Sequence, residues 1–213
     1  MSAKTKGRRS ADDGARARIV ARARERFFSR GYSGLMMDQL AAELGMSKKT
    51  LYVHFAGKDD VVEAVLEEFA AGLRAEADRL LAERTLNFAE KLRGFAQVAM
   101  ERLARVKPKI LQDLEVSAPR LHRTVLELRA KNLPYIFGRF IEEGQLCGAV
   151  RAEVSPVFAS EFYLQAMQGV MQGGMLQRLK TTPDAAFEQG LRIFFSGLLT
   201  PAGEKEYEML FPH

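Results

Sequence analysis

The sequence has one cysteine, no tryptophan and three histidines among its 213 residues. A single cysteine cannot form an internal disulfide, which is typical of a protein kept in the reducing cytoplasm. So few cysteines and histidines leave little from which to build a structural zinc site, and we expect neither a metal nor another cofactor. No run approaches the roughly 20 apolar residues of a membrane span, and no apolar run follows the basic N-terminus as in a secretory signal. We therefore expect a globular protein of the cytoplasm with no membrane segment.

The positive charge of the chain is concentrated at its N-terminal end. The formal net charge is +5, but residues 1–60 hold 13 basic and 7 acidic residues, whereas residues 61–213 hold 19 and 20. A segment of net charge +6 joined to a body of −1 indicates that one part meets a polyanion. The arginine-rich helix in this segment could equally be a solvated surface, so charge alone leaves both interpretations open.

Apolar residues recur at helical spacing along most of the chain, and the alternating Val-, Ile- and Thr-rich runs of strands are nearly missing. Helix starts are marked by the capping box Asn87-x-x-Glu90 and by the pairs Ser155-Pro156 and Thr182-Pro183. Pro134 should kink or break the helix that contains it. These signals predict an all-α fold of about nine helices. The expected spans are 12–30, 37–44, 48–55, 58–82, 87–105, 108–116, 119–143, 156–180 and 183–199.

Residues 36–55, MMDQLAAELGMSKKTLYVHF, have the apolar spacing of two short helices packed across a tight turn. Gly45 can take the left-handed conformation that such a turn requires, and Ser47 can cap the second helix. This pattern is typical of a helix-turn-helix, whose second helix enters the major groove with its N-terminal residues on the bases. Cations, a hydroxyl group and an aromatic ring on the exposed face of this helix suit phosphate and base contacts. That face is expected to hold Lys48, Lys49, Thr50, Tyr52, Val53 and His54.

Further residues extend this motif on both sides, with Gly31-Tyr32 before it and Lys58 after it. Together with Asp38-Gln39-Leu40-Ala41, Leu44-Gly45-Met46-Ser47, Thr50-Leu51-Tyr52 and His54-Phe55, they resemble the signature of the N-terminal domain of the TetR family of bacterial transcriptional regulators. The resemblance covers about residues 12–62, and beyond them the chain is similar only in length and helix order. The family usually has Thr or Ser before the first short helix, where its hydroxyl caps the helix and meets a phosphate. Leu35 and Met36 stand there instead, so this helix must rely on packing or on Asp38 in its first turn.

The resemblance implies which residues contact DNA. They are Lys48, Lys49, Thr50 and Tyr52 at positions that face bases and phosphates, His54 at a further contacting position, and Lys58 at the start of the next helix. Each has a plainer alternative, because Tyr52 could pack between helices and the lysines could be solvated. The basic segment 1–11 could reach the minor groove, or it could be a disordered solubilising arm.

The rest of the chain is expected to form a dimer contact and an effector site. By the resemblance, helices 156–180 and 183–199 join the same helices of a second copy in a four-helix bundle, and both carry more apolar width than one intramolecular face consumes. The resemblance also implies a ligand pocket within residues 85–175, although Met and Phe at helical spacing are more often simple core. Glu115, His122 and Arg123 could supply its polar contacts. The expected lining residues are Phe95, Met100, Leu103, Leu111, Phe137, Phe140, Met167 and Met171.

These expectations divide the chain into a disordered arm (1–11), a helix-turn-helix domain (12–60), an effector-binding and dimerisation domain (61–200) and a tail (201–213). The interpretation is a homodimeric, sequence-specific repressor that binds a palindromic double-stranded operator and is released by a small, mainly apolar effector. The alternative is a ligand-independent DNA-binding protein, architectural or chromosome-organising, on the same fold. An enzyme is not expected, since no Gly-rich phosphate loop, nucleophile elbow or paired metal ligands occur.

Overall fold

The computed structural model describes residues 3–210 of the chain, and the side chains of residues 14–172 and 174–208. Eleven α-helices and no strand occur in this part, which confirms the all-α prediction. None of these helices is both long and apolar enough to cross a membrane. The helices are α1 (Ala3–Arg30), α2 (Met37–Glu43), α3 (Lys48–His54), α4 (Lys58–Ala82), α5 (Phe88–Leu103), α6 (Pro108–Ser117), α7 (Pro119–Leu146), α8 (Pro156–Val170), α9 (Gly173–Arg178), α10 (Pro183–Leu198) and α11 (Pro201–Leu210).

The predicted helix starts are satisfied by side-chain caps. Asn87 and Glu90 form a reciprocal capping box at the start of α5. Ser155 accepts a hydrogen bond from the backbone of Phe158 in α8, and Thr182 accepts one from Ala185 in α10. Each cap satisfies a backbone N–H group that the helix itself leaves without a partner.

Three segments differ from the prediction. The span 156–180 forms two helices, α8 and α9, because the chain turns at residues 171–172 within a glycine-rich stretch that costs helix stability. The expected tail forms α11 as far as Leu210, since Tyr207 is buried and Gly203 lies against the backbone of Ala149. The expected disordered arm continues α1 from Ala3, in a segment rich in Ala, Lys and Arg and free of proline.

Pro134 lies inside α7, and of the two outcomes expected there, a kink or a break, the break does not occur. The residues on both sides hold the helix together by packing: Leu133 contacts the core, and Ile136 and Phe137 are fully buried within it. Tertiary burial of this kind can outweigh the loss of one helix hydrogen bond at proline.

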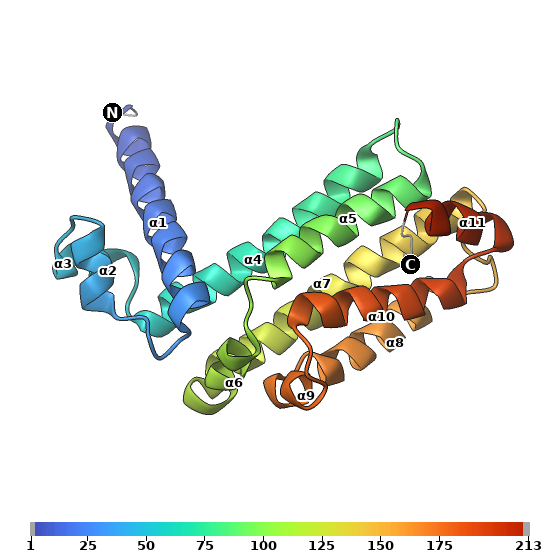
Figure 1. Cartoon of the computed structure of the whole chain (residues 1–213). Coiled ribbons are helices and arrows are strands. Elements are labelled where there is room, and N and C mark those ends of the chain that lie inside the picture. Colours follow the sequence, from blue (N-terminus) through green and yellow to red (C-terminus); the bar gives the residue numbers. More distant parts are fainter. Residues whose placement is uncertain (1–2, 211–213) are drawn as a thin grey trace.

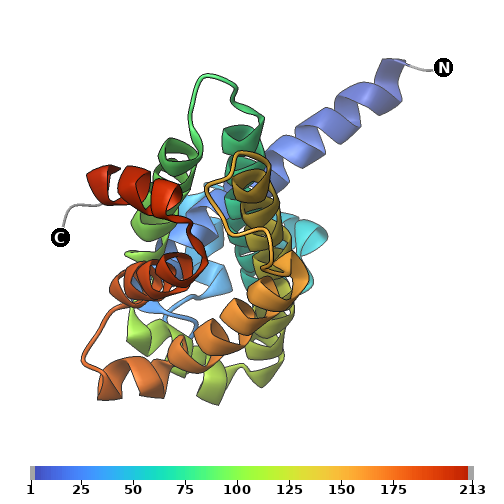
Figure 2. The same cartoon turned by 90° about the vertical axis from the view of Figure 1, so that its right-hand side faces the viewer.

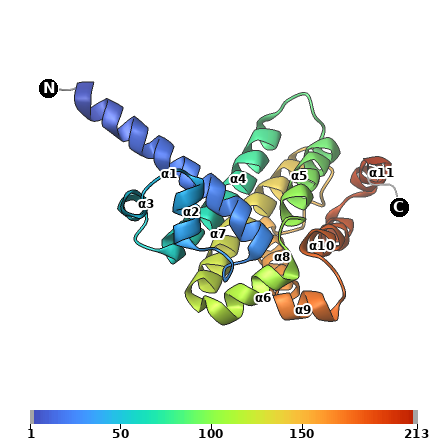
Figure 3. The same cartoon turned by 60° about the vertical axis from the view of Figure 1, so that its left-hand side comes forward.

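The molecule consists of a head at one end and a longer helical body (Figure 1). We call α1–α3 with the first half of α4 the head, and α5–α11 with the second half of α4 the body. α7 packs along both α4 and α8, and α10 packs on α5 and α8. The turned views show the N-terminal end of α1 projecting away from the body (Figures 2 and 3).

Two clusters of buried side chains correspond to these two parts, and α4 contributes to both. Val61 and Val65 belong to the head cluster, whereas Ala77 and Leu80 belong to the body cluster. The head cluster also includes residues of α6 and α7, namely Ile110, Leu114, Ala118 and Leu121. The head is therefore packed directly onto the α6–α7 corner, and it is more than an appendage at the end of α4.

Candidate functional site

The orientation of α3 is set by its packing against α2. Leu40, Ala41 and Leu51 are buried between the two helices. Gly45 has φ +64 in the turn, a backbone conformation that glycine adopts without strain. The Ser47 hydroxyl accepts a hydrogen bond from the backbone N–H of Thr50 at 3.0 Å and so caps α3 as predicted. These contacts hold one face of α3 inside and turn the other face to solvent.

The solvent face of α3 carries most of the residues that the sequence singled out. Lys48, Lys49 and Thr50 are exposed, and Tyr52 and Val53 are 49% and 75% exposed. The Lys48 ammonium pairs with Asp38 of α2 at 2.5 Å, and both side chains are well exposed. An exposed ion pair contributes little to stability, so Lys48 can exchange this carboxylate for another anion at small cost. His54, at the C-terminal end of α3, is partly buried.

Lys58 lies apart from this face, at the start of α4. Its ammonium stands 4.0 Å from the centroid of the Tyr32 ring, a cation–π contact within the head. Burial lowers the pKa of Lys58, while Asp113 and Asp59 oppose the shift. The Tyr32 hydroxyl donates a hydrogen bond to Asp59 at 2.7 Å, which with burial raises the pKa of Tyr32 to about 12. Lys58 would have to leave the Tyr32 ring, at least in part, to reach a phosphate.

The start of α2 lacks the Ser or Thr cap that is usual in the family, as its sequence indicated. Met36 occupies the N-cap position without a side-chain cap and is 57% exposed, whereas Leu35 is buried in the head cluster. Asp38 is the acidic residue of the first turn. α2 is thus stabilised by packing and by the Asp38 carboxylate, which lies near the positive end of the helix dipole.

Several arginines of α1 brace the head. Arg22 and Arg26 both donate hydrogen bonds to Glu43 at the end of α2, at 2.8 and 3.0 Å. Arg24 pairs with Glu68 of α4 at 2.6 Å. The guanidinium carbon of Arg16 lies over the Phe55 ring, 4.8 Å from its centroid. The sequence showed these residues as excess charge, and only the fold reveals their partners.

The body encloses an apolar cavity with a volume of about 140 Å³. Its wall is formed by residues of α1, α4, α5, α6, α7, α8 and α10, so it extends to the junction with the head. Five of the predicted lining residues lie on this wall, and they are Phe95, Leu103, Leu111, Met167 and Met171.

The other three predicted lining residues do not face the cavity. Phe137 and Phe140 are fully buried in an aromatic cluster. The ring centroids of Phe137 and Tyr163 are 4.3 Å apart, and those of Phe140 and Phe95 are 5.3 Å apart. Met100 is partly buried against the same core. An apolar stripe on α5 and α7 predicts burial, but it does not show which residues border an empty volume.

The polar groups on the wall are not those expected. Arg129 and Asn132 of α7 line the cavity, whereas Glu115, His122 and Arg123 do not. His122 instead lies 3.8 Å from Glu115, outside the cavity. Tyr163 also borders the cavity, and its buried hydroxyl has no hydrogen-bond partner within the described residues. Burial raises the pKa of Tyr163, so this hydroxyl stays neutral.

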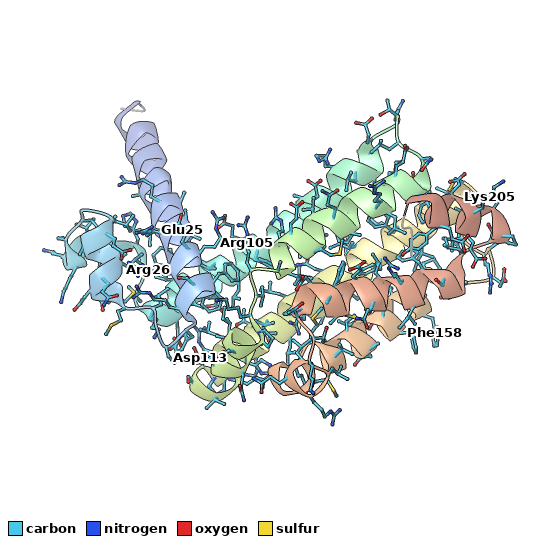
Figure 4. All side chains as sticks on the ribbon, in the orientation of Figure 1. Glu25, Arg26, Arg105, Asp113, Phe158 and Lys205 are labelled. Carbon is cyan, nitrogen blue, oxygen red and sulfur yellow. The ribbon has the colours of Figure 1, made fainter. Side chains whose placement is uncertain are left out.

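The surface of α8 and α10 carries exposed apolar side chains. Val157, Phe158 and Phe162 of α8 and Ile193 of α10 are between 63% and 78% exposed. Phe158 lies on the outer side of α8 (Figure 4). A Cβ atom added at Gly169 would meet nothing within 4 Å. Most other apolar residues of these helices are buried within the chain itself.

No group of three or more His, Cys, Asp or Glu residues among those described could hold a metal ion. Cys147 is exposed and its thiol donates a hydrogen bond to the carbonyl of Gly144 at 3.4 Å. The arrangement therefore consists of a cationic helix face on the head and an apolar cavity in the body.

Comparison with known proteins assigns the head to a family. Residues 19–65 match the sequence model of bacterial regulatory proteins of the tetR family. The HTH-type transcriptional regulator YvaF of Bacillus subtilis is 40% identical over 76 residues, which span 36% of this chain and 40% of YvaF. The HTH-type transcriptional repressor DhaR of a Mycobacterium species is 25% identical over 187 residues, 86% of this chain and 92% of DhaR.

Solved structures share the fold of the whole chain. A transcriptional regulator from Cytophaga hutchinsonii superposes with a TM-score of 0.67 at 18% identity, over 85% of this chain and 97% of that one. A structure of the SmeT–triclosan complex superposes with a TM-score of 0.64 at 18% identity, over 89% of this chain and 94% of that one. The head motif and the family match agree, so the head carries the N-terminal domain of the tetR family of bacterial regulatory proteins, and the chain as a whole shares the fold of these regulators.

Proposed function

We propose that this protein is a homodimeric, sequence-specific repressor whose hold on DNA is released when a small, mainly apolar molecule occupies the cavity of the body. The observation that carries the proposal is the solvent face of α3, where Lys48, Lys49, Thr50 and Tyr52 project from a helix braced on its other side. These side chains are largely exposed in the chain, and each is of a type that contacts phosphate or base edges in DNA.

The chemistry of this face suits a major groove. A helix inserted in the groove places its N-terminal residues against base edges. Lys49 can donate to guanine acceptors or to phosphate, and the Thr50 hydroxyl can donate or accept. The Thr50 hydroxyl lies 2.8 Å from that of Ser47, so its direction is already constrained before DNA binds.

A dimer would follow from the exposed face of α8 and α10. Phe158, Phe162 and Ile193 place large apolar groups in water, and the open surface at Gly169 would let a second backbone approach closely. A two-fold axis through this face gives two copies of α3, as a palindromic site requires.

The helix α6 offers a route from the cavity to α3. Ile110, Leu111 and Leu114 of α6 line the cavity. On the same helix, the Asp113 carboxylate accepts hydrogen bonds from the Ser33 backbone N–H at 2.9 Å and from the Ser33 hydroxyl at 2.6 Å. Asp113 thus ties α6 to the loop between α1 and α2, at the place marked in Figure 4. A ligand that displaces α6 would tilt the head and change the spacing of the two copies of α3.

Known relatives support the two finer parts of this proposal. DhaR is named as a repressor and aligns with most of this chain. One of the solved structures of this fold is a complex of SmeT with triclosan, so a protein of this fold can hold a small molecule.

The DNA contact can be tested by fluorescence anisotropy with an operator selected from random DNA. We expect Lys49→Ala to weaken operator binding and to lower the salt slope by about one if Lys49 meets a phosphate, or to change the preferred base if it reads one. Lys205→Ala is the matched control, because Lys205 is an exposed lysine at the opposite end of the molecule (Figure 4). Equal affinity, slope and base preference in Lys49→Ala and the parent would remove α3 from the interface.

The dimer can be tested by analytical ultracentrifugation at micromolar concentration. We expect the parent chain to be a dimer and Phe158→Glu to be a monomer, since a buried carboxylate at the interface would have no partner. Val116→Glu is the control, because Val116 is 76% exposed on α6 and outside the proposed interface. A parent chain that sediments as a monomer would overturn the dimer. Strong DNA binding at many dispersed sites with no ligand in the cavity would favour the architectural alternative.

A further inference from the structure

Apart from the Tyr163 hydroxyl, the cavity wall is apolar except at one place on α7, where Arg129 and Asn132 line it. These residues are three apart on a helix and therefore share a face. Their neighbours on the wall are aliphatic and aromatic, among them Leu128, Leu133 and Ile136. Placing a cationic side chain against an apolar volume costs free energy, because the charge is partly removed from water.

The Arg129 guanidinium brings a positive charge to the cavity wall. Burial lowers the pKa of Arg129 to about 10, while Glu115 opposes the shift, so the side chain remains cationic at neutral pH. Glu115 is an acidic residue that acts on Arg129, and it also lies 3.8 Å from His122. Arg129 and Asn132 thus place two adjacent side-chain donors on the wall of a largely apolar chamber.

A surface hollow next to the cavity has a matching charge. It is lined by Arg24, Arg105 and Lys107, with Glu25 as its one acidic residue, and it shares Phe28 with the cavity. Glu25 on α1 and Arg105 after α5 flank this hollow (Figure 4). A basic approach to a buried cation would attract an anion and repel a cation.

We propose that the cavity takes a small apolar carboxylate, with its hydrocarbon part in the apolar chamber and its carboxylate on Arg129 and Asn132. The planar guanidinium can donate two parallel hydrogen bonds to one carboxylate, and the Asn132 amide can donate a third. The cavity volume of about 140 Å³ is near that of an engineered protein cavity which binds benzene, so the ligand is of the size of one ring or a short chain. This inference rests on the proposed function, because it names the class of effector for the same cavity.

The experiment compares matched acids and amides by isothermal titration calorimetry on the full-length protein at pH 7.5. Benzoate and hexanoate are the probes, and benzamide and hexanamide are their neutral counterparts. We expect at least one acid to bind more than tenfold tighter than its amide. Arg129→Met should weaken the binding of that acid by about 10- to 100-fold, as expected for the loss of hydrogen bonds to a charged group. The affinity for the amide should stay within about threefold of the parent value.

Two variants make the result specific. Arg123→Met removes an exposed arginine from the same helix and should bind the acid like the parent. Arg129→Met should fold with a similar melting temperature, because it replaces a half-buried charged side chain on an apolar wall by an apolar chain of similar length. Arg129→Lys should recover part of the acid preference.

The outcomes separate this inference from the proposed function. Equal binding of acid and amide, acid binding that survives in Arg129→Met, or no binding of either acid would overturn the inference. If the amides bind and weaken operator binding while the acids do not bind, the release mechanism stands and the anion specificity fails. If an acid binds through Arg129 and operator affinity stays unchanged, the ligand class stands and the release mechanism fails.

Discussion

Replacement of Asp113 by alanine should loosen the head while leaving the cavity intact. Asp113 sits on α6, and its carboxylate accepts hydrogen bonds from the Ser33 backbone N–H, the Ser33 hydroxyl and the Ser117 hydroxyl. The two bonds from Ser33 cross from the body to the head, whereas the bond from Ser117 stays within α6. Asp113 is not part of the cavity wall, so its loss should leave that volume unchanged.

The size of the effect follows from these contacts. A hydrogen bond to a charged acceptor contributes about 1.5–3 kcal/mol when it is well shielded, and Asp113 is only partly buried. We therefore expect Asp113→Ala to lower the free energy of unfolding by about 1–2 kcal/mol. Local opening of the loop between α1 and α2 should become about 5- to 30-fold more frequent, since each 1.4 kcal/mol is a factor of ten.

The contribution of Asp113 should also depend on pH in a defined direction. Burial alone would raise the pKa of Asp113, but the hydrogen bonds from Ser33 and Ser117 outweigh it and hold the pKa below its ordinary value of 3.8. A carboxyl group whose pKa is lower in the folded state stabilises the fold above its unfolded pKa. That stabilisation is lost as the pH falls through the lower folded value, so parent and variant should converge in strong acid.

Hydrogen exchange measured by mass spectrometry is the appropriate assay, with urea unfolding as a second readout. Exchange should rise in Asp113→Ala over residues 31–43, and much less in α8 and α10. Ser117→Ala is the matched control, because it removes only the hydrogen bond within α6. Unchanged exchange over residues 31–43 in Asp113→Ala would refute the claim that α6 holds the head.

Two further predictions concern stability. Lys91 is buried and pairs with Glu143 while donating a hydrogen bond to the carbonyl of Leu81, so Lys91→Ala should lower the free energy of unfolding by about 2 kcal/mol in urea titrations. Lys91→Met should lower the free energy of unfolding by less, because methionine keeps the apolar stem of the side chain. An equal decrease in both variants would contradict this account. Tyr32 should ionise near pH 12 by ultraviolet difference titration, with the fold losing stability between pH 10 and 12, since the folded pKa is raised above the unfolded value of 10. A Tyr32 that titrates near pH 10 would show that its bond to Asp59 does not persist in solution.

Features that depend on local spacing could be predicted from the sequence. The Ser47 cap and the capping box at Asn87 each depend on residues three apart, and the helix-turn-helix positions all lie within residues 36–55. The family resemblance rests on such local patterns too. Most helix boundaries follow because their start signals lie in the chain itself.

Features that depend on packing could not be predicted in the same way. Phe95 and Phe137 look alike on their helices, yet Phe95 borders the cavity and Phe137 fills an aromatic cluster. The spacing of residues in α7 did not single out Arg129, whose place on the cavity wall depends on how the helices of the body pack together. The order of α11 depends on Tyr207 and on the close approach of Gly203 to Ala149, which no local pattern encodes.

The central claim is that the exposed face of α3 reads a two-fold DNA site. Selection of binding sites from random double-stranded DNA tests it most directly, with the parent chain and the Lys48→Ala, Lys49→Ala double variant run in parallel. We predict a palindromic consensus for the parent, with half-sites about one helical turn apart or a multiple of it, and a weakened or altered consensus for the double variant. No enrichment with the parent, or the same consensus and stringency with the variant, would contradict the claim.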